Sequence, residues 1–102
     1  MIPELEIPYR LGGVLQLVEV ARKIVARADI REDTKKMLTG LFAQMEKVVN
    51  QGHFHSREEF VSIDQRFDII LELLTLHKNS MQEGDADKIA EAVTRYRGPL
   101  PF

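Results

Sequence analysis

The stretch 56–82, SREEFVSIDQRFDIILELLTLHKNSMQ, decides the fold class of this chain. Its apolar residues recur at alternating steps of three and four, which is the spacing of one face of an α-helix and of a coiled-coil-like seam. That seam consists of Phe60, Ile63, Phe67, Ile70, Leu74, His77 and Met81. Ser56 and Glu59 form a capping box that favours a helix start. The pattern therefore predicts a helix over 57–82.

Two further helices are predicted before this stretch, over 9–28 and 30–49. The phase of the apolar pattern changes at Ile30, where Asp29 and Glu32 make a capping box, although a single bent helix stays open. Gly52 suits the left-handed position that ends a helix.

A fourth, shorter helix is predicted over 86–97, between the turn Gly84-Asp85 and the stop signal Gly98-Pro99. Near the start of the chain, Gly12-Gly13 lacks the later glycine and the lysine of a phosphate loop. We expect this pair to loosen the first turn or to allow a neighbouring helix to approach closely.

Short connections make successive helices antiparallel neighbours. We therefore predict one all-α domain over 1–102, an up-down-up-down four-helix bundle. Residues 1–8 and 98–102 are expected to be apolar tails, the first extended because its apolar residues alternate with polar residues and proline. Such tails dock on their own bundle, cross to a second subunit, or stay mobile.

The 102 residues suit one domain with one core, and 44% of them are hydrophobic. The chain has no cysteine, which excludes disulfide scaffolds, thiolate zinc sites and cysteine catalysis. The net charge of −2 argues against general nucleic-acid binding, because that binding needs a basic field. Glu4 and Glu6 stand where a signal peptide has bases, and the run 11–18 is too short to span a membrane. We expect a cytoplasmic protein that is not bound to a membrane.

The predicted first and third helices carry more apolar surface than one side of a bundle needs, which predicts a subunit contact. We expect a homodimer interface made of Leu17, Val20, Ile24, Ile69, Leu73 and Leu76. His77, on the seam of the third helix, is a candidate pH-sensitive interface residue, because charging a buried imidazole costs desolvation energy. The acidic residues Asp64, Asp68 and Glu72 and the basic region 22–36 form either complementary surfaces between subunits or two ordinary solvated faces.

One group of side chains has the composition of a metal site. His53 and His55 lie two residues apart in a loop, and Glu59 follows four residues later. Imidazole and carboxylate groups are ligands for divalent metals, although structural zinc sites normally need four of them.

No motif indicates a catalytic nucleophile or a cofactor site. We therefore expect a non-enzymatic interaction or regulatory module that contacts itself and another protein. The alternative is a metal- or ligand-responsive sensor that uses the loop with His53, His55 and Glu59. A third class is a small enzyme whose site forms only across a dimer interface.

Overall fold

The computed structural model describes residues 3–102, and within that range the chain forms helices and no strand. The α-helices are α1 (Pro3–Arg27), α2 (Glu32–Gln51), α3 (Arg57–Leu76) and α4 (Asp85–Arg97). A short 3-10 turn, η1 (Lys78–Ser80), lies between α3 and α4. The predicted all-α class with four helices is confirmed.

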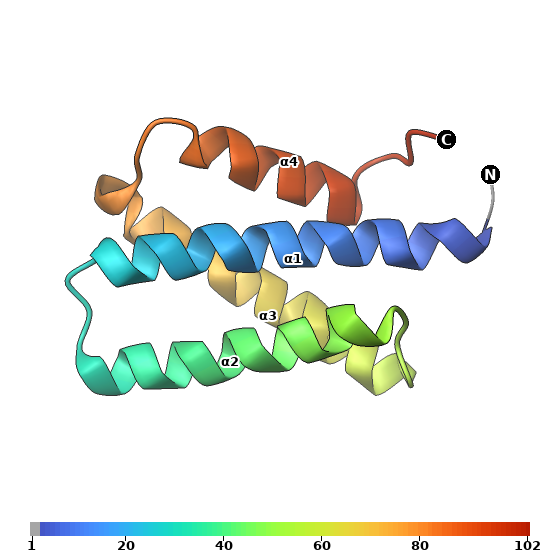
Figure 1. Cartoon of the computed structure of the whole chain (residues 1–102), viewed down its shortest axis with the longest axis horizontal. Helices are drawn as coiled ribbons and strands as arrows, with labels where there is room; N and C mark the ends of the chain where they lie inside the picture. Colours follow the sequence, from blue (N-terminus) through green and yellow to red (C-terminus); the bar gives the residue numbers. More distant parts are fainter. Residues whose placement is uncertain (1–2) are drawn as a thin grey trace.

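Helix α1 is the centre of the arrangement. It lies between α2 and α4, and α3 passes behind it at an oblique angle (Figure 1). All three other helices pack against α1, and the molecule measures 43 × 27 × 17 Å. These contacts are compatible with a helical bundle, while the regular up-down-up-down topology stays a prediction.

The core explains why α1 is apolar on nearly every side. All three other helices pack against it, and its buried core residues are Leu11, Val14, Leu17, Val18, Val20, Ala21, Ile24 and Val25. The seam predicted for α3 is buried at its centre, in Ile63, Phe67, Ile70 and Leu74. Phe60, at the start of that seam, departs from the prediction because 41% of its surface is exposed.

Helices α1 and α4 approach each other closely at Gly13. A Cβ atom at this position would lie 2.8 Å from the Ala92 carbonyl oxygen and 2.8 Å from the Tyr96 backbone nitrogen. These are backbone atoms, so they cannot move aside without shifting the helix. The expectation that the glycine pair permits a close helix approach is confirmed.

The expectation of an extended tail over 1–8 is wrong for the described residues 3–8, which form the first turns of α1. Residues 1 and 2 lie outside the described range. An extended segment needs a partner strand for its backbone hydrogen bonds, whereas a helix satisfies them internally. The ion pair between Glu6 and Arg10, at 3.2 Å, also links successive turns of this helix.

Two helix boundaries also differ from the prediction. Residues Ala28–Arg31 form a loop, so α1 and α2 are separate helices, but Asp29 is not the cap. Arg31 occupies the N-cap position of α2 without a side-chain hydrogen bond, and the start of the helix moves from 30 to 32. At the other boundary, α3 ends at Leu76 rather than at 82, and His77 is its C-cap residue.

The early end of α3 is explained by contacts that the sequence pattern does not contain. The Asp85 carboxylate accepts a hydrogen bond from the Gln82 backbone N–H at 2.8 Å. Arg27, at the end of α1, donates to the same carboxylate at 3.0 Å and to the Ser80 carbonyl at 2.9 Å. The chain between α3 and α4 is therefore fixed by the end of α1.

The connection between α2 and α3 follows the predicted caps. Gly52 has a positive φ of 77° and ends α2 with a hydrogen bond from its N–H to the Val49 carbonyl. Ser56 Oγ accepts a hydrogen bond from the Glu59 N–H at 3.1 Å. Glu59 in turn accepts from the His55 N–H, so its carboxylate reaches one residue further back than in the usual capping box.

Within residues 3–102, none of the helices combines the length and the apolar character that crossing a membrane requires.

The close approach of α1 and α4 predicts opposite effects for two glycine substitutions. Gly13→Ala should destabilise the fold by about 1–3 kcal/mol, because the new methyl group overpacks a backbone contact. Gly40→Ala should stabilise it by about 0.5–1 kcal/mol, because this exposed position in α2 has open space and gains helix propensity. Urea unfolding followed by circular dichroism measures both changes. A stabilising Gly13→Ala would show that the helices do not need this approach.

The Asp85 contacts predict an acid-sensitive contribution to stability. The Gln82 N–H first, and then Arg27, lower the pKa of Asp85 below its usual 3.8. A carboxyl group whose pKa is lowered by folding contributes stability above the unfolded pKa and loses it as the pH falls through the folded pKa. Asp85→Asn should therefore lower the urea midpoint at neutral pH, with a smaller difference from the wild type in strong acid.

Asp87→Asn is the matched control, because Asp87 is an exposed acid in the same first turn of α4. We expect a smaller loss for this variant, from the helix dipole alone. Equal losses for the two variants would contradict a specific role for the Asp85 contacts.

Candidate interaction surfaces

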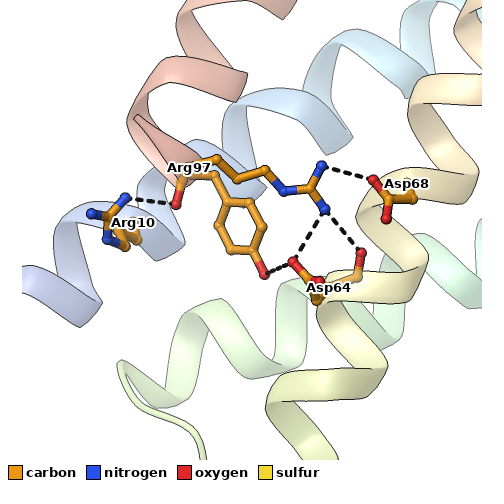
Figure 2. Close-up of polar contacts among 5 residues, drawn as sticks. Arg10, Asp64, Asp68 and Arg97 are labelled. Atoms are coloured by element: carbon orange, nitrogen blue, oxygen red, sulfur yellow. Dashed lines mark hydrogen bonds and ion pairs between the residues drawn. The ribbon is translucent and has the colours of Figure 1, made fainter. Parts of the chain in front are cut away.

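A polar network joins the end of α4 to α3 (Figure 2). Arg97 donates to the Asp68 carboxylate at 2.7 Å and to the Asp64 carboxylate at 3.1 Å. The Tyr96 hydroxyl donates to the same Asp64 oxygen at 3.1 Å, and its ring stacks on Phe67 with 4.4 Å between ring centroids. One turn of α4 thus binds two successive turns of α3.

Two members of this network, Tyr96 and Arg97, have pKa values shifted away from neutral pH. Burial raises the pKa of the Tyr96 phenol above its usual value, and Asp64 beside it adds to the increase. The hydrogen bond to Asp68 is the main cause of a raised pKa for the Arg97 guanidinium. Tyr96 therefore stays neutral and Arg97 stays charged, so the network fastens helices rather than exchanging protons.

A cleft of about 470 Å³ lies beside the network, between the first turns of α1, the α2–α3 loop, α3 and the end of α4. Its apolar lining consists of Ile7, Phe54, Phe60 and Tyr96, and its charged lining consists of Glu6, Arg10, Asp64 and Arg97. The rings of Phe54 and Phe60 meet edge to face, with centroids 5.2 Å apart. We call this hollow the aromatic cleft.

A second apolar feature lies on the outside of α3. Ile69 is 49% exposed and Leu76 is 74% exposed, while Leu73 between them is half-buried. Helix α3 lies behind α1 (Figure 1), and Leu73 packs against the edge of the core while Ile69 and Leu76 beside it stay largely exposed. We call Ile69, Leu73 and Leu76 the α3 outer surface.

The predicted interface therefore divides into two parts. Leu17, Val20 and Ile24 are at most 4% exposed, because α2, α3 and α4 of the same chain cover α1. The prediction that these three residues contact a partner is wrong. The residues of α3 lie where a partner can reach them.

The loop between α2 and α3 does not assemble the predicted metal ligands. The rings of His53 and His55 are adjacent, with centroids 4.8 Å apart. The Glu59 carboxylate instead accepts hydrogen bonds from the His55 N–H at 2.8 Å and from the Gln51 side chain at 3.1 Å. The bond from His55 is the main cause of a lowered pKa for Glu59. Within residues 3–102, no group of three such side chains is placed to hold a metal ion.

His77 lies at the end of α3, half-buried, rather than within the helix as predicted. Its backbone N–H donates to the Leu73 carbonyl at 3.1 Å. It directly follows Leu76 of the α3 outer surface, and its role as a pH-sensitive contact stays a prediction.

The charged regions singled out in the sequence are partly paired within the chain. Arg97 binds Asp64 and Asp68, two of the three acidic residues singled out on α3. In the basic region, Arg22 pairs with Glu46 of α2 and Arg27 pairs with Asp85 of α4. These pairs leave less charge for complementary surfaces between subunits than the sequence suggests.

Sequence reasoning missed the aromatic cleft. Its residues come from four segments of the chain, and only tertiary packing brings them together. Phe54 was the one available signal, because it is a large apolar residue in an otherwise polar loop.

Comparisons of the chain with protein-family models, with curated proteins and with solved structures found no match. Its function therefore has to be argued from the surfaces described above.

The Tyr96 hydrogen bond makes a testable contribution to stability. Tyr96→Phe removes the hydroxyl that donates to Asp64 and should cost about 0.5–1.5 kcal/mol. Thr75→Val is the control, because the Thr75 hydroxyl bonds only its own helix at an exposed position and should matter by less than about 0.5 kcal/mol. Urea unfolding at neutral pH compares the two, and equal small effects would show that the network contributes little.

Proposed function

We propose that this chain is a small, non-enzymatic, up-down-up-down helical module that acts through protein–protein contacts. Its first partner is a second copy of itself, and a further protein binds the resulting dimer. The observation that carries this proposal is the α3 outer surface, where the chain's own helices leave Ile69 and Leu76 exposed beside the half-buried Leu73.

The spacing of this surface suits a contact between two helices. Ile69, Leu73 and Leu76 follow each other at steps of four and three, which is the repeat of a coiled-coil seam. A two-fold axis beside α3 would place the same residues of two copies against each other, as in most homodimers.

The size of the surface indicates a weak dimer. Residues 69–76 span about 10 Å of helix. A stable interface buries about 800 Å² on each partner, which is more than this short seam supplies alone. We therefore expect the dimer to depend on protein concentration and on contacts outside the seam.

Light scattering over a range of concentrations tests the proposal. The wild type should move from a mass near 11.7 kDa toward twice that value as concentration rises. The double variant Ile69→Lys, Leu76→Lys should stay near 11.7 kDa, because two charged side chains would be buried at the contact.

Met37→Lys provides the control, because Met37 is 68% exposed on α2 and lies outside the α3 outer surface. This variant should associate like the wild type. A wild type that is monomeric at every concentration, or a double variant that still dimerises, would refute the proposal.

A further inference from the structure

The aromatic cleft and the segment after α4 lie at the same end of the molecule. The start of α1, the α2–α3 loop and the end of α4 meet there (Figure 1). Ile7 and Phe60 in the cleft lining are 39% and 41% exposed, so the chain itself fills the cleft only in part.

The charged side chains around the cleft are already paired. Glu6 bonds Arg10 at 3.2 Å, and Asp64 bonds Arg97 at 3.1 Å. Arg10 also donates to the Tyr96 carbonyl at 2.8 Å (Figure 2) and to the Gly98 carbonyl at 3.1 Å. Two acids against two bases leave no net charge at the rim. The occupant is therefore selected by its apolar shape rather than by its charge.

The segment Pro99-Leu100-Pro101-Phe102 has a complementary chemistry. Its two prolines restrict the backbone to extended conformations of the polyproline type. Grooves lined by aromatic side chains bind such segments well, because little conformational entropy is lost on binding. Leu100 and Phe102 supply the apolar side chains.

This segment does not fill the cleft of its own chain. The Phe102 ring instead meets the edge of Tyr9, with centroids 5.6 Å apart, and Tyr9 does not line the aromatic cleft. Phe102 remains 47% exposed in that position, so the contact covers only about half of its surface. The segment thus lies outside the lining of its own cleft, and its last residue is only half covered.

We propose that the aromatic cleft of one copy binds the segment 99–102 of a second copy, and that the exchange is reciprocal. One cleft and one segment at the same end of each chain allow a closed two-fold pair. This inference rests on the proposed function, because it requires that two copies of the chain associate. It uses residues separate from the α3 outer surface, and it supplies contact area that the short seam lacks.

Mixing two complementary variants tests the exchange in the full chain. The segment variant carries Leu100→Ser and Phe102→Ser and keeps its cleft, whereas the cleft variant carries Phe60→Ser and keeps its segment. Each should dimerise about tenfold more weakly than the wild type, as expected when an aromatic anchor is lost. An equimolar mixture should form a heterodimer more tightly than either variant pairs alone, because one cleft and one segment remain intact.

Leu5→Ser is the matched control, because Leu5 is 48% exposed in α1 and does not line the cleft. It should associate like the wild type. A segment variant that dimerises normally, or a mixture no tighter than its components, would overturn the exchange.

A peptide titration examines the cleft without requiring a dimer. The probe is a synthetic peptide of residues 97–102, added at up to about 1 mM to the ¹⁵N-labelled segment variant. Amide resonances of Ile7, Phe54 and Phe60 should shift, and a peptide with serine at positions 100 and 102 should not shift them.

Shifts confined to the surroundings of Tyr9, or no shifts at all, would overturn the proposal. If the peptide binds the cleft but the α3 double variant still dimerises, the exchange stands and the α3 contact fails. If the peptide does not bind but the α3 double variant is monomeric, the opposite holds.

Discussion

The covering of α1 on three sides is the constraint on which the rest of this structure depends. A helix that is apolar on nearly every side must be covered on those sides, and the three other helices of this chain all pack against it. Gly13 makes the enclosure tight, because it lets the backbone of α4 approach α1 within the space of a single methyl group. Once α2, α3 and α4 all face α1, they have little surface left for covering one another.

Arginine side chains fasten this arrangement at both ends of α1. At its start, Arg10 donates to carbonyl groups at the end of α4, and Arg95 returns a hydrogen bond to the Tyr9 carbonyl. At the C-terminal end of α1, Arg27 donates to the Ser80 carbonyl and to the Asp85 carboxylate, which fixes the turn that leads into α4. A guanidinium group suits these positions, because its fixed fork of donors satisfies two acceptors at once. Much of the chain's basic charge is therefore engaged in its own fold.

The sequence predicts local features of this protein well and its tertiary contacts poorly. The α3 seam from Ile63 to Leu74 and the caps at Gly52 and Ser56 follow from short-range spacing, and the structure confirms them. An excess of apolar residues on a helix does not by itself show whether the same chain or a partner covers them. For that reason the sequence pattern predicts a partner contact for Leu17, Val20 and Ile24, although the same chain covers them. The end of α3 and the aromatic cleft depend on Arg27, Asp85 and Arg97, whose partners are distant in sequence.

Both uncovered surfaces follow from the position of α3. Because α3 alone forms the second layer, Ile69 and Leu76 on its outer side are exposed to solvent. Because it crosses α1 obliquely, its first turns diverge from the end of α4 (Figure 1), and Arg97 bridges the two helices beside the aromatic cleft. A second copy placed with its α3 parallel to the first would bring the two clefts to the same end. In the proposed dimer, one pairing would cover both surfaces, and the exchange would add contact area to the short α3 seam.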